Sequence, residues 1–494
     1  MSESVKRKNK KVGFCLVSYE EEKVNIPLFD ENIKGGSTNV TVLIGPNGSG
    51  KSRYISRIVD EVCYLHTLRT DGDKAAFRSR GLADQAILKY RFDGKMCVIE
   101  RNILDETRCS INGKSTTLKD IPFPSQVATV SHLPNDKFRF TTESENSFYK
   151  YLGLRQSSNL TTTGALEKKV IQSLITGFST PGFKDRLKNW LRLAGFKEDI
   201  RILLELQSLK LLSGDWREVY EELIRIQSAR AMSPARESSL RPRLDREFDD
   251  IWYFLRLLSV WPVQQGVDGT TMYYELSEVL ESTEAAEIWK KGFDAARRWR
   301  AFKKSSLIFG KSNVGSEFSD LSSGEQQLIG TNSRLLAELN DHSLVVIDEP
   351  EISLHPQWQI KYIPTLLDSL RNIDATHVLI ATHSHFMVSD LGHDNSVLVT
   401  ARYEEGPKFE LFEGDVYGRS PENILYRVFG VATTGNMYVE NDLRKALQMI
   451  AGTETLNIRE LNSTYARLEK VAGPDNPAMN IILERIGSFI EGLK

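Results

Sequence analysis

Residues 40–52 read VTVLIGPNGSGKS, and this stretch decides the fold class of the chain. Val40 to Ile44 form a short continuous apolar run, which is typical of a strand that is buried on both faces. Residues 45–52 fit the pattern G-x-x-x-x-G-K-[ST], and a helix is predicted from about Lys51. A strand that passes through a glycine-rich loop into a helix is the context that makes this pattern specific for phosphate binding.

The loop predicts a binding site for ATP. Glycines let backbone N–H groups approach the phosphates closely, and the start of the helix adds a favourable dipole. We expect Lys51 to reach the β and γ phosphates and the Ser52 hydroxyl to ligate Mg²⁺. An ordinary glycine-rich turn is the alternative interpretation, which the flanking strand and helix disfavour. The predicted nucleotide-binding residues are Gly45, Pro46, Asn47, Gly48, Ser49, Gly50, Lys51 and Ser52.

Two further predicted strands end in residues suited to phosphate chemistry. The apolar run 344–347 is followed by Asp348, which we assign to the metal, and by Glu349, which we expect to polarise the attacking water. His383 follows the strand 378–381 and is expected to hydrogen-bond the γ-phosphate, although a histidine merely satisfied at a strand end is the alternative. The predicted catalytic residues are Glu349 and His383, and the predicted metal ligands are Ser52 and Asp348.

Residues 321–327 read LSSGEQQ and predict the start of another helix. Ser322 and Glu325 have the spacing of a capping box, in which each side chain caps the other's backbone N–H. A helix start is a second anion site. The resemblance of this motif to the signature of ABC-type ATPases implies a second set of nucleotide-binding residues, which are Ser322, Ser323, Gly324 and Glu325.

The composition excludes several classes of protein. A chain of 494 residues is too long for one compact domain. The net charge of −2 argues against a chain covered with DNA-binding positive charge. The sequence has no run of about eighteen apolar residues, so we expect no membrane span and no membrane partner. Four cysteines without a CxxC pair indicate reduced thiols and a cytoplasmic location.

The predicted organisation has four parts. Residues 1–146 hold the first part of an ATPase domain, with hairpin turns at 92–95 and 111–114, and residues 311–420 hold its second part. Residues 147–310 are predicted to be a helical insertion, because leucines recur near helical spacing at Leu203, Leu204, Leu206 and Leu209. Glycines and prolines interrupt this region, so we expect an arm of short helices rather than a long coiled coil. Residues 421–494 are predicted to form a C-terminal helical segment.

The motifs LSSGEQQ, IDEPEISLHP at 347–356 and ATHSHF at 381–386 resemble those of ABC-type ATPases of the OLD-like and SMC-like branches. In size and layout the chain is similar to the ATPase subunits of Septu and retron-associated anti-phage defence systems (PtuA-like). Residues 130–138 and 420–431 carry that second resemblance. The resemblance implies an α/β fold: an ABC-ATPase-type P-loop sandwich with a mostly parallel sheet, an antiparallel β subregion and a helical insertion between the P-loop and LSSGEQQ.

The same resemblance implies partners. Two copies would pair head to tail, with Ser322 of one copy facing the nucleotide at Lys51 of the other, and the nucleotide state would control a separate nuclease, commonly of the HNH type. Higher oligomers, DNA, RNA and a retron reverse-transcriptase complex with its msDNA are further candidates. An HNH cluster and the DxD that a TOPRIM nuclease needs after Asp442 are both missing from the sequence, so no nuclease motif is recognised. An SMC-like DNA-repair ATPase and a transporter energy subunit are the alternatives.

Two features leave alternatives open. No glutamine follows the strand 126–131 where such ATPases carry one, and Asp136 there is either a contact to the metal or its water, or part of a solvated turn. The other motif residues favour hydrolysis of ATP, and the missing glutamine leaves open a slow enzyme in which ATP serves mainly as a structural ligand or an inhibitor of the nuclease. The segment 297–304 interleaves cations with aromatic residues, as a nucleic-acid contact does, but a solvated helix with buried Trp and Phe is the favoured interpretation.

Overall fold

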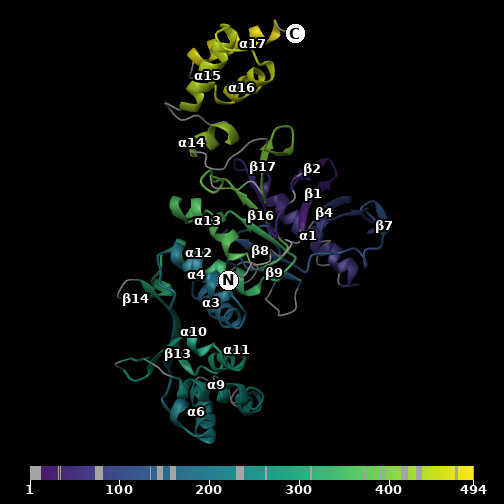
Figure 1. Ribbon diagram of the computed structural model, residues 1–494. Coiled ribbons are helices and arrows are strands. Elements are labelled where there is room, and N and C mark those ends of the chain that lie inside the picture. Colours follow the sequence, from purple (N-terminus) through teal and green to yellow (C-terminus); the bar gives the residue numbers. More distant parts are fainter. Residues whose placement is uncertain are drawn as a thin grey trace, which may run out of the picture.

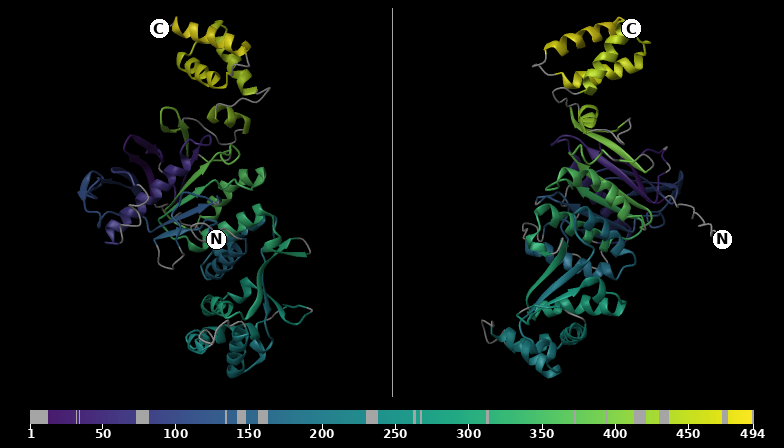
Figure 2. Two further views of the ribbon diagram at one scale, coloured as in Figure 1. Left: turned by 180° about the vertical axis from the view of Figure 1, so that it is seen from behind. Right: turned by 60° about the vertical axis from the view of Figure 1, so that its left-hand side comes forward.

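The computed structural model describes most of the chain and places it in three consecutive parts along one direction (Figure 1). A central lobe holds two sheets, the insertion extends from one end of it, and the C-terminal helices lie beyond the other end, as both views of Figure 2 show. The described residues are 13–31, 33, 35–72, 82–133, 135–141, 148–155, 163–229, 238–261, 264–266, 268–311, 314–371, 373–389, 391–392, 395–412, 421–429, 437–472 and 477–492.

The central sheet has seven described strands in the order β18-β17-β3-β16-β15-β8-β9. Neighbouring strands from β17 to β9 are parallel, and β18 pairs antiparallel to β17. Parallel strands that are covered on both faces have continuous apolar sequences, which is why they could be predicted from the sequence. The bounds are β3 Thr38–Ile44, β8 Gln126–Ser131, β9 Tyr149–Tyr151, β15 Ser343–Asp348, β16 Thr376–Thr382, β17 Ser396–Tyr403 and β18 Pro407–Leu411.

A second, antiparallel sheet of six described strands has the order β2-β1-β4-β5-β6-β7. Both predicted hairpin turns are confirmed: Asp93 and Gly94 link β4 to β5, Asn112 and Gly113 link β6 to β7, and all four have positive φ. The bounds are β1 Cys15–Glu21, β2 Val24–Pro27, β4 Ala86–Phe92, β5 Lys95–Arg101, β6 Thr107–Ile111 and β7 Lys114–Thr116. Helix α1 (Lys51–Arg69) shares one buried core with this sheet and with one face of the central sheet.

Four helices cover the other face of the central sheet and share a second core with it: α3 Thr163–Phe178, α4 Phe183–Leu193, α12 Ser323–Glu338 and α13 Pro356–Ser369. Two of them, α3 and α4, fall inside the range predicted for the insertion, and so does β9. The buried Arg334 of α12 donates hydrogen bonds of 2.7 and 3.2 Å to the carbonyls of Leu152 and Gly153. The central lobe therefore continues past the boundary predicted at residue 146.

The remainder of the insertion combines short helices with an antiparallel sheet in the order β11-β12-β10-β13-β14. The elements are β10 Ile200–Leu206, α5 Lys210–Ser213, α6 Trp216–Ser228, α8 Leu240–Leu244, α9 Phe248–Val260, β11 Gln264–Gln265, β12 Thr271–Glu275, α10 Leu276–Val279, α11 Thr283–Arg298, β13 Phe302–Lys311 and β14 Val314–Glu317, followed by the 3-10 turn η1 Phe318–Asp320. The helices are short, as predicted, but this sheet was not predicted.

The prediction of a helix through Leu203, Leu204, Leu206 and Leu209 is wrong. The first three lie on β10, which pairs with β12 on one side and β13 on the other. Ile200 and Ile202 are buried on this strand, while Arg201 and Glu205 are partly exposed. Pairing with two neighbouring strands decides the structure, because it overrides the helix propensity of leucine.

The C-terminal segment is helical in its described residues and has its own small core. Its elements are α14 Pro421–Ile424, a π-helix Leu425–Phe429, α15 Met437–Ile450, α16 Ile458–Val471 and α17 Pro477–Glu491. Asp442 lies within α15, where it accepts hydrogen bonds from Tyr426 and Arg467, so it serves the packing of these helices. No helix among the described residues has the length and apolar character needed to cross a bilayer.

A buried ion pair fixes α1 to the antiparallel sheet. Arg101 of β5 donates to both carboxylate oxygens of Glu61, at 2.7 and 2.8 Å, and to the carbonyl of Ala83 at 2.8 Å. The Arg101 and Glu61 side chains are 4% and 0% exposed. Removing one partner of such a pair leaves an uncompensated buried charge, which costs far more than removing both.

We therefore expect Arg101→Met to lower the free energy of unfolding by about 3–5 kcal/mol, measured by urea denaturation. The double variant Arg101→Met with Glu61→Leu should recover most of that loss, since neither charge is then buried alone. Equal stabilities of the single and double variants would contradict this account.

Candidate functional site

The P-loop and the motifs that hold Asp348 and His383 meet at one edge of the central sheet, where its parallel strands end. Ile44, the last residue of β3, is paired with Thr382 of β16. Asp348, the last residue of β15, is paired with Ala381 on one side and Ser131 on the other. Because the carboxyl ends of parallel strands lie at the same edge, the loop after each strand opens onto a common region.

The glycine-rich loop wraps over the start of α1. Gly48 and Gly50 have φ of 81° and 94°, a backbone that other residues rarely adopt. At Gly45 a Cβ atom would lie 2.1 Å from the carbonyl oxygen of Ala401 in β17, so only glycine fits there. Lys51 is 5% exposed, and its ammonium donates to the carbonyls of Gly45 and Pro46 at 2.7 and 3.0 Å. Burial lowers the pKa of Lys51, and the nearby carboxylates oppose that shift.

Ser52 and Asp348 are in direct contact although they are far apart in the sequence. The Ser52 hydroxyl donates to Oδ1 of Asp348 at 2.8 Å. Asp348 is fully buried, and burial raises its pKa to about 7, with Glu349, Glu351 and Asp136 adding to the shift and Ser52 opposing it. Within the described residues Oδ2 of Asp348 has no hydrogen-bond partner.

This pair fits a magnesium ion. Mg²⁺ prefers hard oxygen ligands and is usually bound by one or two protein groups together with waters and phosphates. A buried carboxylate oxygen without a partner, next to a hydroxyl, supplies such a donor set.

Glu349 and His383 lie side by side beyond Asp348. Glu349 has a φ of 49°, and its backbone N–H donates to the carbonyl of Ala381 at 2.8 Å. Nδ1 of His383 is 3.8 Å from Oε1 of Glu349 and 3.2 Å from Oε1 of Glu351. The same oxygen of Glu351 accepts the backbone N–H of His383 at 2.8 Å.

Glu351 is a site residue that the sequence analysis did not assign. It is 6% exposed, and its Oε2 has no hydrogen-bond partner in the part of the chain that the structure describes. A third acid two positions after Glu349, in the quoted motif IDEPEISLHP, was the available signal. Its contact to His383 depends on β15 and β16 being neighbours, which the sequence does not state.

The predicted capping box at the start of α12 is confirmed. The Glu325 carboxylate accepts the Ser322 N–H at 2.8 Å, and Ser322 Oγ accepts the Glu325 N–H at 3.3 Å. Lys311 pairs with the same carboxylate at 2.7 Å. A Cβ atom on Gly324 would lie 2.5 Å from the carbonyl oxygen of Ser353, so this helix start is packed tightly against the segment that follows Glu351.

The structure brings only part of the predicted site together within one chain. A cavity of about 370 Å³ beside the P-loop is lined by Asn47, Gly48, Gly50, Lys51, Ser52, Arg53, Tyr54, Glu349, Tyr403 and Pro407. None of Ser322, Ser323, Gly324 and Glu325 is among these described lining residues. Ser322 and Ser323 are instead exposed at the start of α12.

Asp136 is buried and hydrogen-bonded to protein groups rather than solvated. Its side chain is fully buried and accepts hydrogen bonds from Arg155 at 2.5 and 3.2 Å and from the Tyr151 hydroxyl at 2.5 Å. The interpretation as a solvated turn is therefore wrong. The carboxylate links the loop after β8 to the segment that leads into α3.

The structure of the basic segment 297–304 favours a solvated surface with buried aromatic residues over a nucleic-acid contact. Trp299 and Phe302 are buried, at 3% and 7% exposure. Most of its cations are engaged with carboxylates, in the ion pairs Arg297–Asp294, Arg298–Glu247, Lys303–Glu205 and Lys304–Glu317. The second half of the segment is the start of β13 rather than helix.

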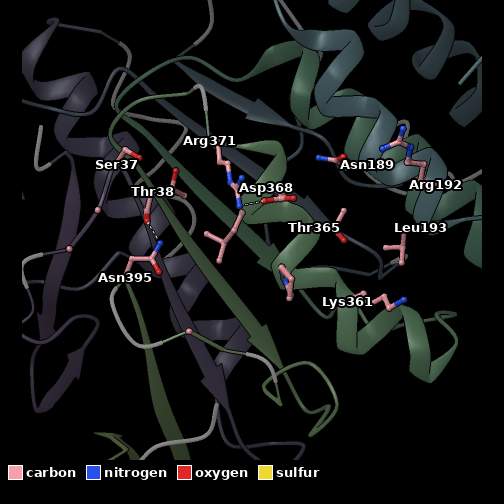
Figure 3. Close-up of a pocket in the computed structure, with 15 residues that line it drawn as sticks. Ser37, Thr38, Asn189, Arg192, Leu193, Lys361, Thr365, Asp368, Arg371 and Asn395 are labelled. Carbon is pink, nitrogen blue, oxygen red and sulfur yellow. Dashed lines mark hydrogen bonds and ion pairs between the residues drawn. The ribbon is translucent and has the colours of Figure 1, made fainter. Parts of the chain in front are cut away.

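A larger cavity, of about 830 Å³, lies elsewhere (Figure 3). It is lined by the start of β3 at Thr38 and by residues of α4 and α13, including Asn189, Lys361 and Asp368. Arg371 and Asp368 form an ion pair of 2.6 Å at its wall. No predicted site residue is among its described lining residues, so size alone does not mark the functional site.

Comparisons with known proteins agree with the motifs. A family profile described as "AAA domain, putative AbiEii toxin, Type IV TA system" matches residues 126–389. The chain is 28% identical over 220 residues to "Retron Ec83 probable ATPase" of Escherichia coli, covering 42% of this chain and 39% of that protein. It is 27% identical over 207 residues to "Septu protein PtuA" of Bacillus thuringiensis, covering 37% and 49%. The chain thus spans less than half the length of these two relatives.

Solved structures of SMC heads are also similar. A head bound to the C-winged helix domain of ScpA has a TM-score of 0.33 and 12% identity, covering 81% of this chain and 97% of that one. The SMC head domain from Thermotoga maritima has a TM-score of 0.32 and 12% identity, covering 81% and 99%. At these scores the likeness supports no conclusion about this chain.

The raised pKa of Asp348 gives a testable effect on stability. Its folded pKa of about 7 lies above the ordinary value, so the metal-free folded protein loses stability as the pH rises from about 4, where the carboxyl ionises in the unfolded chain, to about 7, where it ionises in the folded protein. Asp348→Asn removes that charge and should raise the thermal midpoint at pH 8 by a few degrees, with a smaller rise at pH 5 and little effect at about pH 4. Differential scanning calorimetry in EDTA measures this, with the exposed Asp71→Asn as control. A lower midpoint of Asp348→Asn at pH 8 would show that the carboxylate stabilises the fold instead.

Proposed function

This chain belongs to the AAA-domain family whose profile it matches, and from that premise we propose that it is the ATP-binding and ATP-hydrolysing subunit of a bacterial anti-phage defence complex. The observation that carries the proposal is the meeting of Lys51, Ser52, Asp348, Glu349 and His383 at one edge of the central sheet. An edge of this kind combines phosphate binding with metal support and water positioning, which phosphoryl transfer to water requires.

The P-loop side of the site would bind the triphosphate. The backbone N–H groups at the start of α1 would face the phosphates, because the helix dipole there favours negative charge. Lys51 would exchange its two carbonyl acceptors for phosphate oxygens, which are stronger acceptors for a buried ammonium. Ser52 and Asp348 would hold Mg²⁺, which neutralises charge that builds up on the phosphates during hydrolysis.

The acidic side of the site would activate water. Glu349 lines the cavity and would accept a proton from the attacking water. His383 would donate a hydrogen bond to the γ-phosphate. The Glu351 carboxylate contacts both the backbone N–H and the ring of His383, so we assign Glu351 as a positioning residue for His383.

We propose that a second copy of the chain completes the nucleotide-binding site. Ser322 and Ser323 lie exposed at a helix start, and they do not line the chain's own P-loop cavity among the described residues. A helix start with free N–H groups is an anion site. In a head-to-tail pair this site would face the γ-phosphate held by Lys51 of the other copy.

The defence role and the partners rest on the two relatives, of which the chain covers less than half. Their names associate them with a retron and with Septu. We propose a separate nuclease, of the HNH type, as the partner that the nucleotide state regulates, in the cytoplasm. DNA, RNA or a retron reverse-transcriptase complex with its msDNA are further proposed partners. The alternative of an SMC-like repair ATPase is disfavoured by the insertion, whose described part has short helices and a sheet in place of a long coiled coil.

A pull-down tests the partner. The tagged chain is expressed with its neighbouring genes and purified with ATP and Mg²⁺, in parallel with Lys51→Ala. A co-eluting nuclease that is lost or gained with Lys51→Ala supports nucleotide-controlled assembly. A homodimer without a nuclease, together with DNA-stimulated hydrolysis, would favour the repair ATPase and overturn the defence proposal.

Glu349→Gln tests the assignment of the base. The variant keeps the shape of the side chain but cannot accept the proton, so hydrolysis should fall by about 100-fold or more while ATP binding is kept. Such a variant should accumulate as an ATP-bound dimer, measured by size exclusion with light scattering. Adding Ser322→Arg should return it to a monomer that still binds ATP. Hydrolysis at the wild-type rate in Glu349→Gln would refute the assigned role.

A further inference from the structure

Tyr403 is an exposed aromatic residue in an unusual place. It is the last residue of β17, and its side chain is 67% exposed. It lines the same cavity as the P-loop residues Gly48, Gly50 and Lys51. None of the motifs discussed above includes it, and the proposed hydrolysis does not use it.

The alternation of β17 explains why the ring faces this cavity. Val399 and Ala401 lie on the same face of the strand as Tyr403, and both belong to the core shared with α1. Leu398, on the opposite face, belongs to the other core. Tyr403 therefore continues the face that α1 covers, but it lies beyond Ala401, where Gly45 already turns into the loop and α1 has not yet begun.

The hairpin between β17 and β18 holds this ring next to the loop. Tyr403 is paired with Pro407 across the hairpin, and the Glu404 N–H donates to the Gly406 carbonyl at 3.1 Å. A Cβ atom on Gly50 would lie 3.8 Å from Cβ of Pro407, so the hairpin touches the loop at the start of α1. The backbone pairing of the hairpin thus holds the Tyr403 ring on one side of the cavity. Lys51 and Ser52 also line this cavity.

We propose that Tyr403 is the base platform of the nucleotide site: its ring stacks on the base of the nucleotide whose phosphates the P-loop binds. Exposed aromatic rings stack on nucleic-acid bases because every base has a π face and an apolar surface to bury. Stacking does not read the hydrogen-bonding edge of a base, so the platform serves ATP and GTP alike. The proposal rests on the proposed nucleotide-binding function and adds the element that recognises the base.

Tripolyphosphate has no base, so its binding separates recognition of the phosphates by the P-loop from recognition of the base by Tyr403. Binding of ATP, GTP and tripolyphosphate with Mg²⁺ is measured by isothermal titration calorimetry for the full chain. Tyr403→Ala should weaken ATP and GTP by about tenfold or more and leave tripolyphosphate unchanged. Tyr403→Phe keeps the ring and should bind like the wild type. Tyr253→Ala, which removes a tyrosine of 59% exposure from α9, is the matched control and should change nothing.

Each other outcome has a distinct meaning. Unchanged ATP binding by Tyr403→Ala would overturn the proposal. An equal loss of ATP and tripolyphosphate would also overturn it, because the ring would then support the loop rather than the base. If the wild type binds neither ATP nor tripolyphosphate, the proposed nucleotide-binding function is overturned, and the proposed role of Tyr403 is overturned as well. Thermal melting of each variant separates these results from misfolding.

Discussion

The hydrogen bond between Ser52 and Asp348 is the contact on which the rest of the site depends. It joins the first turn of α1 to the end of β15 across almost 300 residues of sequence, and it is made at the buried edge of the central sheet. The bond requires β3, β16 and β15 to be adjacent and in the register observed. A slip of one residue in either pairing would turn Asp348 to the opposite face of the sheet, away from the loop.

This arrangement has an electrostatic cost. Asp348 is fully buried, with Glu349 and Glu351 close enough to raise its pKa further. Lys51 is also nearly buried and offsets part of this negative charge. Carboxylates gathered without enough positive charge destabilise a folded protein unless a cation compensates them. These buried carboxylates therefore lower the stability of the folded protein, as is common at sites that bind metal and phosphate.

The sequence predicted those parts of the structure that depend on local signals. The P-loop, the two hairpin turns and the capping box at Ser322 each follow from the conformational needs of a few neighbouring residues. The strand β10 was mistaken for a helix because its leucines interrupt a clean alternation, and the pairing with β12 and β13 that decides the matter is not local. Glu351 and Tyr403 were missed for the same reason. Their significance comes from neighbours that are adjacent only in the folded sheet.

The packing of Gly324 against the carbonyl of Ser353 has a mechanical consequence. Two backbones in contact have no flexible side chain between them to absorb a displacement. Glu349, Glu351 and Ser353 lie on one short stretch of chain, so a push at the start of α12 is passed directly to the turn that carries the acids. In a pair of copies the phosphate bound by one chain would press on this point of the other. Occupancy of one site would then be transmitted to the acidic turn of the neighbouring copy, and such a pair would hydrolyse ATP cooperatively.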